Sequence, residues 1–233
     1  MILSIIIPVY NEEKTIKSVL DEVAKLQLPE GFVKEIIVVN DGSTDSTEGI
    51  IANYDGIKLI NKENGGKGSA VKVGYNVCRG DYVIVKDADL EQRSDDILKL
   101  LNYAIFHKTD FLIGSRFTGS YRPSSFKMRL HKFVNTSFGW VIGFLVGAKI
   151  NDAWSGYKLL SKKSLYVLKE KINEPSIEFE LESILIIGKS KIQIHEIPIN
   201  YNPRWYADGK KTSYRHVLKS FRYLSRAVMR GHE

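Results

Sequence analysis

The chain has 233 residues, of which 43% are hydrophobic, and a formal net charge of +7. This length and apolar content fit one large folded domain and exclude a disordered chain. The single cysteine, Cys78, excludes an internal disulfide framework and favours a cytosolic setting. The first residues lack a basic segment and a cleavage site, so we expect a strand there rather than a signal peptide.

The first half of the chain predicts a parallel sheet covered by helices on both faces. Continuous apolar runs predict strands at residues 3–9, 35–39, 57–60, 82–85 and 110–113. Apolar residues at helical spacing predict helices at residues 16–26, 44–53, 67–78 and 97–105. Because the strand runs are apolar throughout rather than alternating, both faces of the sheet should be buried.

The second half departs from this alternation. Residues 125–148 are expected to be helical, and their uncharged part, 133–148, is shorter than the ~20 residues that cross a bilayer. A pair of core helices and a helix in a membrane interface both fit, and Trp140, among apolar and basic residues, favours the interface. Further strands are predicted at residues 156–160, 192–194 and 197–201, and a helix at residues 176–187.

Residues 213–233 are predicted to form a basic amphipathic helix. Its basic residues share one face: Arg215, Lys219, Arg222, Arg226 and Arg230. Its apolar residues share the opposite face: Val217, Phe221, Leu224 and Val228. Packing of that apolar face on the domain and docking of the helix on an anionic membrane fit equally. The excess of positive charge in the second half of the chain predicts that this half faces anions.

Two carboxylates follow the fourth predicted strand, in the triplet Asp87-Ala88-Asp89. Ligands of open α/β sheets bind at the carboxyl edge of the strands, where both side chains should lie. Paired carboxylates are costly unless a positive group lies between them. Mg²⁺ is usually held by one or two carboxylates together with substrate phosphates. The triplet therefore predicts a metal-dependent enzyme that acts on a nucleotide or diphosphate.

Polar or glycine-rich loops follow the other predicted strands of the first half as well. Asp41, after the second strand, is either a helix cap or a hydrogen-bond partner of a nucleoside. Gly65 and Gly66, before a helix, allow close backbone approach and offer N–H groups to an anion. Five such loops along one sheet edge predict a nucleotide site.

These loops together resemble a known family. The motifs are residues 8–12 (Pro-Val-Tyr-Asn-Glu), 41–45 (Asp-Gly-Ser-Thr-Asp), 64–68 (Asn-Gly-Gly-Lys-Gly), 87–89 (Asp-Ala-Asp) and 114–116 (Gly-Ser-Arg). They resemble family 2 glycosyltransferases of the GT-A fold, and within them the dolichyl-phosphate mannose and glucose synthases. The resemblance implies an α/β, Rossmann-like, mostly parallel sheet covered by helices, with amphipathic interface helices at the C-terminus. The catalytic domain would span 1–212, with a nucleotide-sugar and metal half (1–115), an acceptor half (116–212) and a basic helix (213–233).

The resemblance also implies roles for individual residues. Mg²⁺ or Mn²⁺ would be held by Asp87, Asp89 and Glu91, although many relatives carry Gln at the last position. The nucleotide would be bound by Pro8, Tyr10, Glu12, Asp41, Lys67 and Asp87. The acceptor phosphate would face Arg116, Arg129, Arg204 and Lys211. The catalytic group would comprise Asp89, Arg116 and Asp152, with Asp152 either a catalytic or orienting acid or a turn cap. Glu180 is either one half of a buried ion pair or part of a solvated face.

The expected reaction is inverting transfer of a hexose from a nucleotide-diphosphate sugar to a polyprenyl phosphate. A phosphate acceptor is already largely anionic at pH 7, so a cationic pocket matters more than a strong base. The donor would be GDP-mannose or UDP-glucose, with mannose slightly favoured. The enzyme would sit peripherally on the cytoplasmic face of an anionic membrane, without a transmembrane segment, possessing either a membrane-anchoring partner or a homo-oligomeric form. A glycan hydroxyl acceptor is the alternative, and a basic nucleic-acid-binding module is a remote one.

Overall fold

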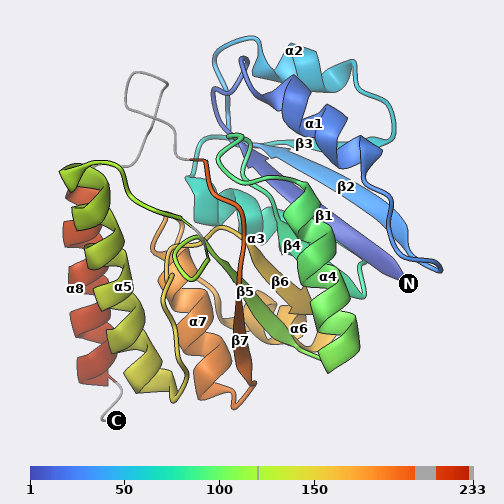
Figure 1. Ribbon diagram of the computed structural model, residues 1–233. Helices are drawn as coiled ribbons and strands as arrows, with labels where there is room; N and C mark the ends of the chain where they lie inside the picture. The colour runs from blue at the N-terminus through green and yellow to red at the C-terminus, as the bar shows by residue number, and fades with distance from the viewer. Residues whose placement is uncertain (120, 203–213, 231–233) are drawn as a thin grey trace.

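The computed structural model describes residues 1–119, 121–202 and 214–230, which form one sheet with helices on both faces (Figure 1). The strands are β1 (Ile2–Val9), β2 (Val33–Asn40), β3 (Ile57–Asn61), β4 (Tyr82–Val85), β5 (Phe111–Ser115), β6 (Lys158–Ser161) and β7 (Ile194–Pro198). The helices are α1 (Ile16–Lys25), α2 (Thr47–Ala52), α3 (Lys67–Val77), α4 (Asp95–His107), α5 (Phe126–Val146), α6 (Lys162–Lys171), α7 (Phe179–Lys189) and α8 (Tyr214–Arg230).

The strand order in the sheet, β3-β2-β1-β4-β6-β5-β7, explains where a ligand can bind. All neighbouring pairs are parallel except those made by β6, which is antiparallel to both β4 and β5. The chain moves outward from β1 to β3 and then returns to place β4 on the other side of β1. Such a reversal opens a crevice at the carboxyl ends of β1 and β4, which is where Asp87 follows β4.

Two hydrophobic cores explain why the strand runs are apolar throughout. In β1, Leu3, Ile5 and Ile7 face a core shared with α1 and α4, whereas Ile6 faces the other core with α3. All four side chains are fully buried. Successive side chains of a strand point to opposite faces, so a strand covered on both sides needs no polar alternation. The prediction of a mostly parallel sheet with both faces covered is confirmed.

The second half differs from the sequence prediction in three places. The runs 192–194 and 197–201, predicted as two strands, contribute a single strand, β7, because after Pro198 the chain leaves β5 and Tyr201 bridges Gln92 instead. The strand predicted at 156–160 begins later, at Lys158, since the preceding residues belong to a turn. Helix α6 was not predicted; it follows β6 directly, and the Ser161 hydroxyl caps it by accepting from the Ser164 N–H.

Helices α5 and α8 also depart from the simplest expectation. The stretch 125–148 forms one continuous helix of 21 residues rather than a helix pair. In α8, Leu224 of the predicted apolar face is buried, but Phe221 of the same face is 64% exposed and Ser220 is buried, so the face that packs on the domain is rotated from the predicted apolar face. Among the residues described, the structure contains no helix whose length and apolar character would let it cross a membrane.

Candidate active site

A chain of four alternating charges lies at the carboxyl end of β4. The Lys67 Nζ lies 2.6 Å from the Asp87 Oδ1 and 3.0 Å from the Glu180 Oε1. The other oxygen of Glu180 pairs with the Lys158 ammonium, which also donates to the Ser155 carbonyl at 2.6 Å. The side chains of Glu180 and Lys158 are almost completely buried, at 1% and 3% exposed. This series of charged side chains links Asp87, the first carboxylate of the Asp-Ala-Asp triplet, to the interior of the domain.

The charge chain keeps Asp87 ionised. Burial by itself would raise the pKa of Asp87, but the Lys67 ammonium outweighs it and holds the pKa below the ordinary 3.8. Burial likewise opposes the charge of Lys67, and the carboxylates of Asp87 and Glu180 raise its pKa above 10.5. Lys158 is the exception, because burial outweighs Glu180 and lowers its pKa.

Gly156 touches the same carboxylate. A Cβ at this position would lie 2.4 Å from the Asp87 Oδ2 and 3.2 Å from the Lys67 Nζ. The first distance is far shorter than any van der Waals contact, so Asp87 could not keep its position beside a larger residue. The Trp154-Ser155-Gly156 turn therefore contributes directly to the geometry of the carboxylate.

We expect Gly156→Ala to weaken metal-dependent nucleotide binding because Asp87 must move away from Lys67. A displacement of about 1 Å at a reacting centre can cost ~100-fold in rate. Calorimetric titration with nucleotide and Mn²⁺ measures the loss of affinity, and an activity assay measures the loss of rate. Gly49→Ala in α2 is the matched control, since a Cβ there meets no atom within 4 Å. If Gly156→Ala bound the nucleotide as tightly as wild type, the position of Asp87 would not matter for nucleotide binding.

A buried lysine holds the loop that carries the second carboxylate, Asp89. The Lys86 side chain is fully buried, and its Nζ donates to the carbonyl oxygens of Asp87 and Gln92, both at 3.0 Å. It thereby joins the two ends of the loop. Within the loop, the half-buried Asp89 accepts a hydrogen bond from the Glu91 N–H at 3.2 Å.

The donor set fits a divalent cation that also binds phosphate. Among the described residues there is no group of three His, Cys, Asp or Glu side chains placed to hold a metal ion. Asp87 and Asp89 supply two carboxylates after the carboxyl end of β4, and Mg²⁺ commonly takes one or two carboxylates plus substrate phosphates. Glu91 contributes negative charge near Arg116 and Tyr201.

Asp41 is engaged by the glycine-rich loop. Its Oδ1 accepts from the Gly65 N–H at 2.9 Å and its Oδ2 from the Gly66 N–H at 2.8 Å. Lys62 pairs with the same carboxylate at 2.5 Å, and Asp41 is 3% exposed. The anion that these glycine N–H groups hold is thus the Asp41 side chain itself. Gly66 has φ +92°, and a Cβ there would lie 2.7 Å from the Pro175 carbonyl oxygen, so glycine is required.

Other predicted nucleotide-binding residues lie at the carboxyl end of β1 and in the loop that follows it. Pro8 is buried in β1, and the Tyr10 ring is 38% exposed just beyond it. The Thr15 hydroxyl lies 2.9 Å from the Glu12 Oε2 and 2.7 Å from the Ala88 carbonyl oxygen. Thr15 therefore ties the loop after β1 to the Asp-Ala-Asp triplet.

Arg116 and Asp152 form a second buried charged cluster, after β5. The Arg116 Nε and Nη2 donate to the two oxygens of Asp152 at 2.8 and 2.7 Å. The Arg116 N–H and the Asn135 Nδ2 complete the set at 2.9 and 3.0 Å, so Asp152 accepts four hydrogen bonds. Burial would raise the pKa of Asp152, but Arg116 outweighs it and holds the pKa below 3.8. Asp152 is fully buried, and Arg116 keeps 11% of its side chain exposed.

Aromatic rings surround the exposed part of Arg116. Its guanidinium carbon lies 5.2 Å from the centroid of Phe117 and 5.3 Å from that of Tyr201. Tyr121 packs edge-on against Tyr201 and lines a cavity of about 160 Å³. Arg129 is exposed on the first turns of α5, whereas Arg204 and Lys211 lie outside the described residues.

The structure brings four of the predicted site residues together in two pairs that the sequence did not predict. Lys67 lies beside Asp87, and Arg116 lies beside Asp152. Lys158, Asn135 and Lys86 were missed by sequence reasoning. Lys86 carried a signal, because a lysine ends an otherwise apolar strand just before the two carboxylates. Asn135 and Lys158 carried none, since each reaches its partner only through the tertiary fold.

Comparison with known proteins identifies the family. The model of glycosyl transferase family 2 matches residues 4–168. The chain belongs to glycosyl transferase family 2. Within this family it is 32% identical to a dolichyl-phosphate beta-glucosyltransferase of Trichomonas vaginalis over 84% of the chain, and it spans 63% of that relative. It is 30% identical to a UDP-N-acetylglucosamine–dolichyl-phosphate N-acetylglucosaminyltransferase of Methanococcus voltae, over 97% of this chain and 94% of that protein.

A solved structure confirms the fold of this family 2 glycosyltransferase. Glucosyl-3-phosphoglycerate synthase of Mycobacterium tuberculosis, in complex with Mn²⁺, UDP and phosphoglyceric acid, superposes with a TM-score of 0.72. The match covers 98% of this chain and 78% of that one, at 19% identity. The GT-A fold expected from the sequence is therefore confirmed.

Proposed function

We propose that this glycosyltransferase transfers a hexose from a nucleotide-diphosphate sugar to the phosphate of a polyprenyl phosphate, with inversion. The observation that carries the proposal is the hydrogen bonding of Asp152. Both of its oxygens accept two donors each, so the carboxylate has no lone pair left to take a proton from an acceptor hydroxyl. An acceptor that is already anionic needs no such base.

The acceptor phosphate would bind at the exposed side of Arg116. Asp152 occupies Nε and one N–H of Nη2, and the remaining guanidinium N–H groups are not bound by this carboxylate. Asp152 is then a positioning residue, since it orients the guanidinium. Arg129, Arg204 and Lys211 remain candidates for further phosphate contacts.

The donor would bind across the crevice between β1 and β4. Asp89 and Asp87 would hold Mg²⁺ or Mn²⁺, with Glu91 as a further candidate ligand. When bound, the cation stabilises the negative charge that develops on the departing diphosphate. Lys67, 26% exposed beside Asp87, would face the same phosphates, and the exposed Tyr10 ring would stack on the base. Glu12 and Asp41 hold the loops that shape the nucleoside pocket.

The named relatives favour a UDP-linked sugar. Two of them are a glucosyltransferase and a UDP-N-acetylglucosamine-dependent enzyme, both named for dolichyl phosphate. We therefore place UDP-glucose and UDP-N-acetylglucosamine ahead of GDP-mannose, which the sequence had slightly favoured. A peripheral position on the cytoplasmic face of a membrane, and an anchoring partner or homo-oligomer, complete the proposal.

A radiolabelled transfer assay tests the proposal. Purified protein receives Mg²⁺ or Mn²⁺, a short-chain polyprenyl phosphate and each labelled donor in parallel. Label should enter the organic phase with one donor, and EDTA or Asp89→Ala should abolish the transfer by removing the cation or its ligand. Transfer to glycan hydroxyls instead of the lipid would select the alternative acceptor. Tight, salt-sensitive nucleic-acid binding without any transfer would favour the remote alternative.

A further inference from the structure

The loop after β4 is held by contacts from several parts of the chain. We call residues 87–93, which include both carboxylates of the Asp-Ala-Asp triplet, the carboxylate loop. The Lys86 Nζ donates to two of its carbonyl oxygens, both at 3.0 Å, the Thr15 hydroxyl donates to a third at 2.7 Å, and the Tyr157 hydroxyl donates to a fourth at 3.1 Å. Because these donors come from the end of β4, the loop after β1 and the turn before β6, the carboxylate loop has a fixed place in the domain.

The chain after β7 crosses from β5 onto the carboxylate loop. At residue 199 the backbone N–H still donates to a β5 carbonyl oxygen at 2.9 Å. Two residues later Tyr201 forms an antiparallel bridge with Gln92, and the Asn202 N–H donates to the Glu91 carbonyl oxygen at 2.8 Å. We call residues 199–202 the crossing segment. Its backbone therefore joins the second half of the chain to the loop that carries the two carboxylates.

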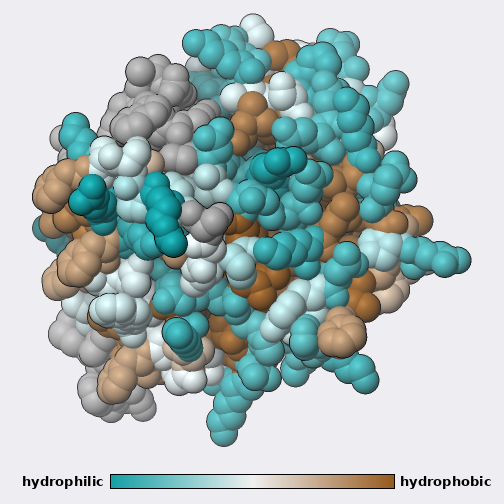
Figure 2. Space-filling view, viewed as in Figure 1, coloured by the Kyte–Doolittle hydropathy of each residue, from teal (hydrophilic) through white to brown (hydrophobic). Residues whose placement is uncertain are grey.

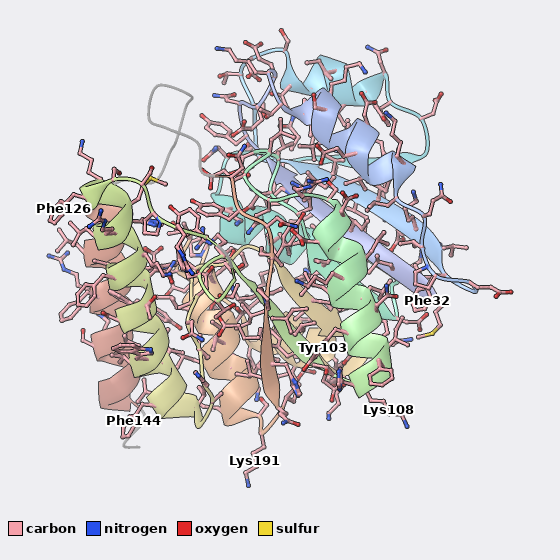
Figure 3. The ribbon with its side chains drawn as sticks, viewed as in Figure 1. Phe32, Tyr103, Lys108, Phe126, Phe144 and Lys191 are labelled. Carbon is pink, nitrogen blue, oxygen red and sulfur yellow. The ribbon has the colours of Figure 1, made fainter. Side chains whose placement is uncertain are left out.

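The crossing segment lies at the same end of the sheet as the two charged clusters. Strands β5 and β7 are parallel, so their carboxyl ends lie together. Lys108 and Lys191, which precede these two strands, lie at the lower edge of the molecule in Figure 3, at the opposite end. Figure 2 shows mainly hydrophilic side chains over the upper part of the molecule, which suits a site that two anionic substrates enter.

The ring of Tyr201 contacts the guanidinium of Arg116. The two groups are 5.3 Å apart, within the ~6 Å over which a ring face attracts a cation. The half-buried Tyr201 ring is itself held edge-on by Phe117 at 6.2 Å and by Tyr121 at 5.2 Å. Asp152 fixes the guanidinium against the turn after α5, whereas Tyr201 fixes it against a residue that is bonded to the carboxylate loop.

The spacing between the carboxylate loop and Arg116 matters for a transfer reaction. In the proposed function the loop places the donor and Arg116 places the acceptor phosphate. The reacting atoms of two such substrates must come within about 3–3.5 Å of each other, and a misplacement of about 1 Å can cost ~100-fold in rate. Two anions also repel each other, so the protein has to impose this spacing.

We propose that Tyr201 is a positioning residue that sets the distance between Arg116 and the carboxylates Asp87 and Asp89. Its backbone is joined to the loop of the carboxylates and its ring to the guanidinium, so it transmits the position of one to the other. The inference deepens the proposed function and rests on it for the roles of Arg116 and the carboxylates. Without the ring, the guanidinium keeps its bonds to Asp152 but loses its contact with the loop.

Steady-state kinetics with a short-chain polyprenyl phosphate test the proposal. At saturating donor and acceptor, Tyr201→Leu should lower kcat by ~100-fold. Its affinity for nucleotide and Mn²⁺, measured by calorimetry, should remain that of wild type. Tyr201→Phe keeps the ring and should keep the wild-type kcat. Tyr103→Leu is the matched control, because Tyr103 is a half-buried tyrosine whose hydroxyl lies 3.2 Å from the His195 Nδ1, at the other end of β7. It should leave kcat unchanged.

The outcomes separate positioning from other roles of Tyr201. A higher acceptor KM at unchanged kcat in Tyr201→Leu would overturn the inference, since it would show that the ring only adds affinity. An equal loss of kcat in Tyr201→Phe would also overturn it, because the hydroxyl would then act on the substrate. So would a loss of nucleotide affinity in Tyr201→Leu, or a comparable fall of kcat in Tyr103→Leu.

The same experiment distinguishes this inference from the proposed function. Wild-type transfer to the polyprenyl phosphate, together with wild-type kinetics in Tyr201→Leu, would overturn the positioning role and leave the function standing. Absence of transfer by the wild-type protein, despite nucleotide binding, would overturn the proposed function and the inference that rests on it.

Discussion

Asp152→Ala is expected to destabilise the protein by about 3–5 kcal/mol, because it leaves the Arg116 guanidinium buried without its partner. For a domain of this size the loss corresponds to a fall in Tm of roughly 6–20 °C, measurable by calorimetry. Transfer should be lost as well, since Arg116 would no longer be held toward the acceptor phosphate. The exposed pair Arg93–Asp95, 67% and 68% exposed, provides the control, and Asp95→Ala should leave Tm unchanged.

A double variant separates stability from function in this cluster. Replacing a buried ion pair by apolar side chains of similar volume is often neutral for stability. Arg116→Met with Asp152→Leu should therefore recover part of the lost Tm without recovering transfer, since the Arg116 N–H and the Asn135 Nδ2 still lose their acceptor. If the double variant transferred sugar at the wild-type rate, Arg116 would not bind the acceptor phosphate.

The same pair should be sensitive to acid. Because the pKa of Asp152 in the folded protein lies below 3.8, its stabilising effect is complete above that pH and is lost as the pH falls through the folded value. The difference in unfolding free energy between wild type and Asp152→Ala should thus be constant at neutral pH and shrink below about pH 3.8. Denaturant titrations across this range measure it, and a constant difference would contradict the assignment.

Glu180→Ala is expected to have a comparable effect, about 3–5 kcal/mol at neutral pH, because it leaves Lys158 buried and unpaired. Burial already lowers the pKa of Lys158 in the presence of Glu180. Without the carboxylate the ammonium should lose its proton more readily, which removes the buried charge.

The stability of Glu180→Ala should consequently rise between pH 7 and about pH 10, and this rise should begin at a lower pH and be larger than in wild type, where burial also lowers the pKa of Lys158. The sign follows from linkage, since the unfolded chain binds more protons than the folded variant in this range. Melting curves across the range measure it, with Lys158→Met, Glu180→Leu as the variant that should lack the slope. A flat profile for Glu180→Ala would show that Lys158 reaches water when its partner is removed.

The strands of the first half were predictable because their signal is local. Each is a short apolar run ended by polar or glycine residues, and both faces are buried, so no tertiary information was needed to find β1 to β5. The motif residues could be placed at one sheet edge for a related reason, although the sequence did not predict which of them pair. Parallel strands bring their carboxyl ends to one edge, and this places Lys67 near Asp87 and Arg116 near the turn that follows Asn151.

The remaining elements and residue pairs depend on contacts between residues that lie far apart in the sequence. The sequence of helix α6 is Lys-Lys-Ser-Leu-Tyr-Val-Leu-Lys-Glu-Lys. Its four lysines obscure the short apolar face that Leu165 and Leu168 bury in the core. Pairing with β5 fixes the register of β7, which ends at Pro198. Beyond the strand, Tyr201 pairs with Gln92 instead. The buried Lys158 looks like an ordinary surface lysine until Glu180, 22 residues away, is brought to it.

The antiparallel strand β6 has a consequence for engineering and for evolution. It comes from the second half of the chain, yet it lies between β4 and β5, which both come from the first half. A fragment cut at residue 115 would leave the inner edges of β4 and β5 exposed to pairing with other chains. The proposed nucleotide-sugar half (1–115) and acceptor half (116–212) therefore cannot be exchanged as independent modules. A chimera with a new second half must also carry a β6 whose side chains fit the host core.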